Sequence, residues 1–423
     1  MEIINKILWS LTFISIIISG IYFSIKLKGE QFKISKMIRA LKKKGNTNIS
    51  SFDSLMMSTA AKVGVGSLAG VALAIYKGGI GVIFWIWITS IISAPNAFVE
   101  GILGTIYKEK INNENVGGPA YYIKKGLKNR KLAITYAILV TIVYVICFTT
   151  IQANTISTSI SNSFNIKKII VGILLAYIVL IIIWRNTKSL FNLVSKIVPI
   201  MGIGYIIIGL IIAIREWNMV PVFFSSIIKE ALNLRSSSIG IFTSLIIGIQ
   251  RGIFSNEAGI GTGAIASASV DDSITPLTQG RSQVLGVYFI SLIIGTITAF
   301  IISTSPYQKI VLNDPNGIEL THLAFKYHLG NVGEIVLIMA IITFALSTII
   351  AGFYYGKSNL IFIFKKIPPL QETIYKIFIT VLMIIGSITS SSIIWNLSDI
   401  FIAILAIINI YAILSLRKDV IKT

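Results

Sequence analysis

The chain has 423 residues, of which 54% are hydrophobic and only 13% are charged, and its mean hydropathy is +0.83. A soluble protein of this size needs a far more polar surface, so the composition excludes an ordinary soluble domain. In a soluble protein the formal net charge of +20 would point to nucleic acid. Here the Lys and Arg residues cluster in short loops beside apolar segments, which argues against a nucleic-acid partner and is typical of a membrane protein.

Apolar runs of the length that a membrane helix needs, roughly 20 residues, recur along the chain. They predict an all-α polytopic membrane protein with about eleven transmembrane helices and no second domain. In chain order the predicted helices are 4–26, 54–76, 80–107, 132–160, 168–184, 190–214, 238–267, 284–304, 333–356, 372–390 and 393–416.

The first apolar run, from Ile7 to Leu27, has features in common with a secretory signal peptide. Its basic region is thin, with Lys6 close to Glu2, and no small-residue cleavage site follows it. We therefore expect a retained first membrane helix.

The basic loops predict how the chain is oriented in the membrane. The segment from Lys26 to Lys44 is densely basic, and crossing the membrane helix by helix places the other strongly basic loops and the C-terminal tail on the same side. That side is expected to be cytoplasmic, with the N-terminus outside and the C-terminus inside the cell membrane. Apolar residues recur at helical spacing from Phe32 to Leu41, which predicts an amphipathic helix over Lys33–Lys44 on the inner membrane surface, next to anionic lipid.

Residues that carry metal or nucleophilic chemistry are scarce in this sequence. The single cysteine, Cys147, lies in an apolar run, and the two histidines, His322 and His328, share one predicted polar loop. These residues do not make up a Cys/His metal site or a catalytic triad within the membrane. The sequence therefore predicts neither an enzyme nor a bound cofactor.

Two glycine-rich interruptions fall inside predicted membrane helices. The first is Gly-Val-Gly-Ser at 64–67, inside the helix at 54–76, and the second is Phe-Ser-Asn-Glu-Ala-Gly-Ile-Gly at 254–261, inside the helix at 238–267. Glycine weakens a helix by roughly 1 kcal/mol relative to alanine, so we expect both helices to unwind at these places.

The positions of the two breaks suggest an internal repeat. With the N-terminal helix set aside, the breaks fall in core helices 1 and 6 of ten, which is what a five-plus-five inverted repeat predicts for a transporter. We expect an N-terminal segment at 1–52, holding the first helix and the basic amphipathic segment, a first repeat at 53–214 and a second at 236–416, all within a single transmembrane domain.

An unwound membrane helix exposes main-chain groups that need partners. The half-helix that starts near Ser67 offers N–H groups and a positive dipole end, which suit a carboxylate. The half-helix that ends near Val63 offers carbonyls, which suit an ammonium group or Na⁺. The alternative is that the glycines only let neighbouring helices pack closely.

Several polar residues in predicted membrane helices are further candidates. A buried carboxylate such as Glu257, next to Asn256, is costly at mid-membrane and is by default a functional hypothesis, the alternative being that it holds the unwound backbone. Gln152 is a candidate ligand for a zwitterion, and the alternative for both Gln152 and Asn154 is an interhelical hydrogen bond.

Hydroxyl and charged side chains complete the set of candidates. Ser347 and Thr348 offer oxygen ligands for a hard cation, the alternative being hydrogen bonds to the preceding helical turn. Lys62 and Arg251 flank the two breaks and are expected to line aqueous vestibules. Glu100 is expected to be a packing or salt-bridge partner rather than a ligand.

Five stretches of the sequence together resemble the alanine or glycine:cation symporter family, whose members are sodium:alanine symporters of bacteria and archaea. They are KVGVGSLAGVALAIYKGGIGVIFWIW at 62–87, VGGPAYYIKKGL at 116–127, IQANTIS at 151–157, RGIFSNEAGIGTGAIASA at 251–268 and STIIAGFYYGK at 347–357. The stretch RGIFSNEAGIG is the most specific. The resemblance covers most of the chain, from about Phe52 to Lys357.

The resemblance implies the LeuT-type fold and Na⁺-coupled uptake of a small neutral amino acid by alternating access. The residues that it implies for substrate binding are Gly64, Val65, Gly66, Ser67, Gln152, Phe254, Gly259, Thr348 and Gly352. For Na⁺ it implies the carbonyls of Ala60, Val63 and Phe344 and the hydroxyls of Ser347 and Thr348.

The chain departs from the family pattern at three of these positions. The family usually reads Gly-Thr-Gly-Asn at the first break, where this chain has Val65 and Ser67 in place of Thr and Asn. The family also usually has tryptophan where Gly352 stands. We therefore expect a pocket that accepts a neutral amino acid larger than alanine.

Other functions are compatible with parts of the pattern. The departures leave open a non-transporting amino-acid sensor or degenerate paralogue of the same fold, although the chain shows no output domain. Coupling to H⁺ instead of Na⁺ would make Glu257 the candidate proton carrier. A channel would need a continuous polar pore or a ring of charge, and no predicted helix supplies one.

Overall fold

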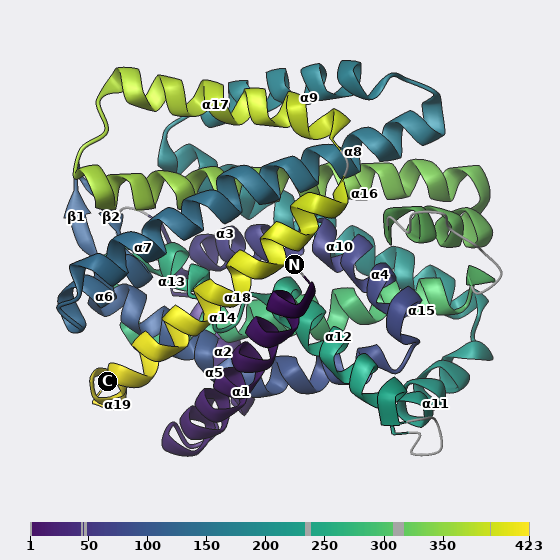
Figure 1. Ribbon diagram of the computed structural model, residues 1–423, viewed down its shortest axis with the longest axis horizontal. Coiled ribbons are helices and arrows are strands. Elements are labelled where there is room, and N and C mark those ends of the chain that lie inside the picture. The colour runs from purple at the N-terminus through teal and green to yellow at the C-terminus, as the bar shows by residue number, and fades with distance from the viewer. Residues whose placement is uncertain are drawn as a thin grey trace.

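The computed structural model describes residues 2–43, 45, 49–232, 238–307, 317–389 and 391–422. Within these residues the chain is helical apart from one β-hairpin (Figure 1). The part before residue 216 contains α1 (Glu2–Lys26), η1 (Glu30–Phe32), α2 (Ile34–Leu41), α3 (Ser51–Val63), η2 (Val65–Ser67), α4 (Ala69–Gly78), α5 (Val82–Ile106), β1 (Glu109–Ile111), β2 (Glu114–Val116), α6 (Pro119–Gly126), α7 (Arg130–Thr141), η3 (Ile142–Phe148), α8 (Thr149–Phe164), α9 (Lys168–Ile183) and α10 (Thr187–Arg215).

The described residues after 216 are also mostly helical. They contain α11 (Met219–Ala231), α12 (Ser238–Asn256), α13 (Thr262–Ala268), α14 (Pro276–Tyr288), η4 (Phe289–Ile294), α15 (Gly295–Ser303), α16 (Gly317–Phe364), α17 (Pro369–Ile388), α18 (Ser391–Ser415) and α19 (Arg417–Ile421). The segments η3 and η4 are π-helical and join the helices on either side of them into long helices.

In the described part of the chain, eight helices are long and apolar enough to cross a membrane, and the bent pair of α3 and α4 would make a ninth. The predicted all-helical membrane architecture is confirmed. The predicted count of eleven differs at two places. Helix α9 is apolar but has only 16 residues, and the predicted helix at 238–267 is divided into α12 and the seven-residue α13. The count of eleven therefore stays a prediction.

Two segments that the sequence indicated as loops contain helices. Helix α11 lies within the predicted loop at 215–237, and α16 begins at Gly317, well before the predicted start at residue 333. Within α16 the backbone is non-helical only at Gly330, with φ 60° and ψ −146°, a conformation that glycine adopts without steric cost. Both histidines therefore lie on α16 rather than in a loop. Neither added segment is a long apolar run, which is why hydropathy did not reveal it.

The amphipathic segment after the first helix forms α2, which is shorter than the predicted 33–44. Met37 and Ala40 are buried, and α2 packs on α14, whereas Ile34 and Ile38 are exposed. Lys44 lies outside the described residues. Helix α1 packs against α5 and α18, and Figure 1 shows α1 and α18 crossing the front of the view.

Local sequence signals fix where the first broken helix begins. The Ser50 hydroxyl accepts a hydrogen bond from the Asp53 N–H at 3.1 Å, and the Ser50 N–H donates to Asp53 Oδ2 at 3.0 Å. This capping box satisfies two N-terminal donors, and a single capping interaction contributes about 1 kcal/mol. From this start α3 runs into the helical bundle, where it packs against α12 and α16, and η2 directly after it packs against α8.

Candidate functional site

The first break lies in the middle of the α3–α4 pair. Helix α3 ends at Val63, η2 forms one tight turn, and the axis bends by 57° before α4 continues. Only glycine fits at residue 64, because a Cβ atom there would lie 2.6 Å from both Gln152 Nε2 and Thr348 Oγ1. All the residues of this break are buried. The glycine therefore lets the side chains of two other helices reach the backbone at the break.

Side chains take up the polar main-chain groups at this break. The Val65 N–H donates to Gln152 Oε1 at 3.2 Å. The Ser67 hydroxyl lies 2.5 Å from the Val63 carbonyl oxygen and 3.0 Å from that of Gly64, and its single proton serves one of them at a time. Ser67 thus turns back onto the carbonyls that the break releases.

A cluster of oxygen atoms joins α3 to α16 directly before the break. The Thr348 hydroxyl lies 2.7 Å from the Ala60 carbonyl oxygen and 3.0 Å from that of Phe344. The Ser347 hydroxyl donates to the Phe344 carbonyl at 2.8 Å. Both hydroxyl residues are at most 1% exposed. Carbonyl and hydroxyl oxygens in a water-poor place are the ligands that hard cations prefer, so this donor set fits Na⁺ chemically.

The second break separates α12 from α13. Glu257, Gly259 and Gly261 have φ angles of 55°, 98° and 101°. For the glycines this left-handed conformation carries no penalty, whereas for Glu257 it costs on the order of 1 kcal/mol or more. Asn256 ties the segment down, since its Oδ1 accepts from the Ala258 N–H at 2.9 Å and its Nδ2 donates to Ser90 Oγ at 2.9 Å.

Two buried carboxylates hold this second break. Glu257 Oε2 accepts from the Thr262 hydroxyl at 2.7 Å, within its own segment. Glu100 of α5 accepts from the Gly259 N–H at 2.8 Å and from Asn409 Nδ2 at 2.8 Å. Glu100 therefore contacts the unwound backbone of the second break directly, a contact that the sequence analysis did not predict. Lys62, only 3% exposed, interacts electrostatically with both carboxylates and lines a small cavity at the first break.

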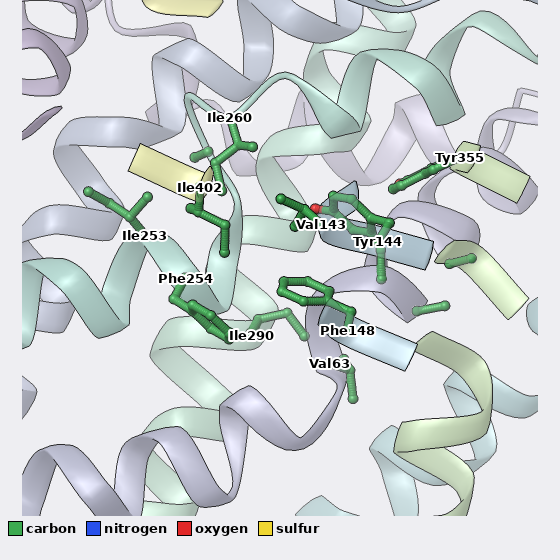
Figure 2. Packing of buried hydrophobic residues seen from close by; sticks show 14 of the residues in the cluster. Val63, Val143, Tyr144, Phe148, Ile253, Phe254, Ile260, Ile290, Tyr355 and Ile402 are labelled. Atoms are coloured by element: carbon green, nitrogen blue, oxygen red, sulfur yellow. The ribbon is translucent and has the colours of Figure 1, made fainter. Parts of the chain in front are cut away.

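A small cavity of about 10 Å³, with room for about one water molecule, lies beside the first break. It is lined by Ala61, Lys62, Gly64, Val65, Gly66, Phe148, Ile151, Gln152, Phe254 and Trp395. Five of the residues predicted for substrate binding are thus together: the three at 64–66, Gln152 and Phe254. The rings of Phe148 and Phe254 lie side by side at the cavity, 5.4 Å apart between centroids (Figure 2).

The other predicted substrate residues lie beside the cavity rather than in its wall. Ser67 and Thr348 are engaged with the main-chain carbonyls described above. A Cβ at Gly259 would meet Ile16 and Asn96, on the side of α1 and α5. A Cβ at Gly352 would lie 2.9 Å from the Tyr144 carbonyl oxygen, so this glycine permits close packing of α16 on η3.

Several site residues escaped the sequence analysis. Phe148 lies one helical turn before Gln152, at a spacing of four residues, and this spacing is the signal that would have found it. Trp395 belongs to a helix for which no site residue was predicted, and no sequence signal indicates it. Asn154, by contrast, donates to the Thr389 carbonyl at 2.6 Å, so its interhelical alternative is the one that the structure supports.

A larger cavity of about 880 Å³ has Asn396, the residue after Trp395, in its wall. Arg251 and Asp399 line it, with Arg251 Nη2 2.6 Å from Asp399 Oδ2, and both side chains are at least nine-tenths buried. Arg251 thus lies at a vestibule, as its position beside the second break predicted.

Comparison with known proteins adds to this geometry. A family described as the sodium:alanine symporter family matches residues 1–423. The amino-acid carrier protein AlsT of Bacillus subtilis is 37% identical over 413 residues, which cover 97% of this chain and 87% of AlsT. GlnT of the same organism, described as a probable sodium/glutamine symporter, is 35% identical over 426 residues, covering 99% and 88%. A solved structure of a Na⁺-coupled sialic acid symporter, in a substrate-bound outward-open state, shares the fold with a TM-score of 0.53 and 14% identity, covering 95% of this chain and 82% of that one.

Proposed function

Because the chain belongs to the sodium:alanine symporter family, we propose that it takes up a small neutral amino acid of the alanine and glycine class together with Na⁺, by alternating access. The chain is a multi-pass membrane protein of a transporter family, not an enzyme. The proposal concerns its substrate, the residues that bind it and the mechanism.

The observation that carries the proposal is the first break with its partners. The main chain unwinds beside a cavity, one face of the break is bonded to Gln152, and the other side leads to the oxygen cluster around Thr348. A zwitterion needs donors for its carboxylate and acceptors for its ammonium group. The Val65 N–H, which is bonded to Gln152, would turn to the carboxylate when substrate binds, and the Gln152 amide can donate or accept.

Na⁺ would bind the oxygen cluster between α3 and α16. Its ligands would be the carbonyls of Ala60, Val63 and Phe344 and the hydroxyls of Ser347 and Thr348. These hydroxyl protons point at carbonyl oxygens, and rotating them away frees both kinds of oxygen for a cation. Na⁺ would then tie α3 to α16, which gives the ion a direct influence on the position of the first break.

The substrate side chain would lie against Phe148 and Phe254, whose rings leave little room beside Gly66. This enclosure favours a small neutral side chain. The sequence predicted a longer side chain from Gly352, but the close approach of the Tyr144 carbonyl accounts for that glycine. The name of the relative GlnT makes glutamine the natural long substrate to test.

The arrangement in the membrane is also a proposal. It has ten core helices in two inverted repeats, 53–214 and 236–416, after an N-terminal segment at 1–52. The N-terminus lies outside the cell and the C-terminus in the cytoplasm. The exposed apolar residues Ile34 and Ile38 of α2, with the lysines beside them, would then face anionic lipid of the inner leaflet.

Uptake into proteoliposomes tests the proposed function. Labelled glycine, alanine, serine, glutamine and leucine are offered with an inward Na⁺ gradient, with a K⁺ gradient and with a pH gradient alone. We expect concentrative uptake of small amino acids that requires Na⁺ and is strongly reduced in Thr348→Ala. Thr343→Ala is the matched control, because its hydroxyl bonds only within α16.

The outcomes separate the alternatives. Binding without uptake under any gradient would favour the sensor, and uptake driven by the pH gradient alone would favour H⁺ coupling through Glu257. Equal uptake in Thr348→Ala and Thr343→Ala would remove the oxygen cluster from the proposal.

A further inference from the structure

We propose that Trp395 of α18 is a specificity-determining residue, whose indole ring closes the outer side of the substrate cavity and limits the size of the side chain that binds. The inference rests on the proposed function and deepens it. It assigns the size limit to a helix in which neither the sequence pattern nor the family resemblance placed a site residue.

The first step is the position of the ring. Trp395 lines the cavity together with Gln152 and the residues of the first break. Its ring packs on that of Phe254, with centroids 5.1 Å apart, and a Cβ at Gly66 would lie 3.1 Å from the Phe254 ring. Gly66, Phe254 and Trp395 therefore form one stack that runs outward from the unwound backbone.

The second step is what holds the ring in place. The guanidinium of Arg251 lies 5.6 Å from the centre of the Trp395 ring and 5.3 Å from that of Phe254, distances at which a cation is attracted to aromatic faces. Asp399 fixes Arg251 through the 2.6 Å ion pair and also accepts from Gln250 Nε2 at 2.8 Å.

The spacing of these residues makes the group one unit. Arg251 and Phe254 are three residues apart on α12, and Trp395 and Asp399 are four residues apart on α18, so each pair shares one helix face. The two faces meet with the ion pair on one level and the aromatic pair on the next. Arg251 and Asp399 are therefore positioning residues for Trp395.

The third step is the separation of two cavities. Arg251, Gln250 and Asp399 line the larger outer cavity, whereas Phe254 and Trp395 line the small inner one. The unit of Arg251, Phe254, Trp395 and Asp399 separates the two cavities. A substrate side chain too long for the inner cavity would meet the indole ring of Trp395, since that ring lies where the cavity would otherwise continue outward.

The position of Gly352 gives the contrast. The space that a side chain at residue 352 would need is occupied by the Tyr144 carbonyl. Enlarging or reducing residue 352 changes helix packing, whereas reducing residue 395 changes the cavity. Trp395 and not Gly352 is thus the residue through which substrate size is set.

Competition binding on purified protein tests this inference without requiring transport. Displacement of labelled alanine by serine, glutamine, leucine and phenylalanine is measured for the wild type, Trp395→Ala, Trp395→Leu and Trp395→Phe. Trp217→Ala is the matched control, since Trp217 is 70% exposed and lies away from both cavities.

We expect Trp395→Ala to raise the affinity for the long side chains relative to alanine by roughly tenfold or more, because one methylene in an apolar pocket already changes discrimination by about that factor. For Trp395→Leu, the affinity for long side chains relative to alanine should lie between the values for the wild type and Trp395→Ala. Trp395→Phe should stay near the wild-type value, and Trp217→Ala should equal it. Asp399→Asn should broaden the range in the same direction with a smaller shift, since it only loosens the ring.

An unchanged ratio of long to short side chains in the folded Trp395→Ala or Trp395→Leu protein would overturn the inference, and so would equal loss of all ligands. If Trp395→Ala does not fold, the Leu and Phe variants decide. Failure of wild-type uptake would count against the proposed function only, because the binding ratios would still report on Trp395.

Discussion

The main-chain N–H of Val65 donates a hydrogen bond to Oε1 of Gln152 across 3.2 Å, and this bond joins the unwound part of the first broken helix to α8. Two segments 87 residues apart in sequence thereby share one polar contact. The contact lies at the wall of the small cavity, so a substrate that binds there would meet both partners.

Replacing Gln152 by alanine should weaken substrate binding. The substitution leaves a buried N–H without its partner, which costs about 1–3 kcal/mol, and we expect alanine affinity to fall roughly tenfold or more. Titration of purified protein measures the affinity. Asn154→Ala, two residues away, is the control, because its side chain donates to Gly386 in α17 and to Thr389 directly after it. It should lower thermal stability while the affinity of the folded protein stays near wild type. The reverse pattern would place the ligand contact on Asn154.

Gly64 and Gly70 form a second matched pair. A Cβ at Gly64 would lie 2.6 Å from two side-chain atoms, whereas a Cβ at Gly70 would have no atom within 4 Å. Gly64→Ala should therefore overpack the break, at a cost of about 1–3 kcal/mol, and abolish most uptake. Gly70→Ala should leave the stability near that of the wild type or slightly above it, because Gly70 is the second residue of α4 and a Cβ there meets no atom. Uptake and melting temperature are measured for both. Wild-type uptake by Gly64→Ala would mean that the close approach is not needed.

Glu257 provides a test of scaffold against proton carrier. Glutamine at this position keeps an oxygen that can accept from the Thr262 hydroxyl, so Glu257→Gln should retain a substantial part of the Na⁺-driven uptake. Glu257→Ala removes the acceptor and should lose most of it. Both are compared in proteoliposomes with Na⁺ and with pH gradients. Complete loss in a folded Glu257→Gln protein would instead favour a role that needs ionisation.

Glu30 should make stability depend on pH. Burial acts to raise the pKa of Glu30, but hydrogen bonds and charge interactions with Arg281 and Lys33 outweigh it and hold the pKa below its usual range. A lowered carboxyl pKa adds stability above the unfolded-state value of about 4.3, and this stability is lost as the pH falls through the folded-state value. Glu30→Gln should therefore melt below the wild type at pH 7. The difference should shrink below about pH 4, and a difference that grows on acidification would contradict the ion pairs.

Sequence reasoning located both helix breaks because glycine runs and a carboxylate are costly inside a membrane and so stand out in an apolar segment. Gln152 and the pair Ser347 and Thr348 were predicted from motif and chemistry, and the structure brings them to the first break. What these side chains bind is a proposal, because hydrogen bonds within the protein do not identify a ligand.

The aromatic part of the site could not be read in the same way. Trp395 lies in an apolar helix where a large ring is ordinary, and only three-dimensional packing shows that it lines the cavity. Phe148 also lies among apolar residues, and its spacing of four residues from Gln152 is the one sequence signal that indicates it. The neighbours of Gly352 were equally inaccessible, since they depend on how closely α16 approaches η3. Glu100 was given a packing role because the partner that defines its task, the Gly259 N–H, lies 159 residues away.

The π-helical segment η3 has a consequence for how the gene tolerates change. A π-helical turn holds one residue more than an α-helical turn, so deleting one codon between Ile142 and Phe148 would let the wide turn close into a regular one while the helices on either side keep their places. A deletion in the first turn of α8 has no such reserve, because an α-helix turns by about 100° per residue and Gln152 would rotate away from Val65. The π-helical segment is thus the place in this long helix where the gene tolerates the loss of a codon.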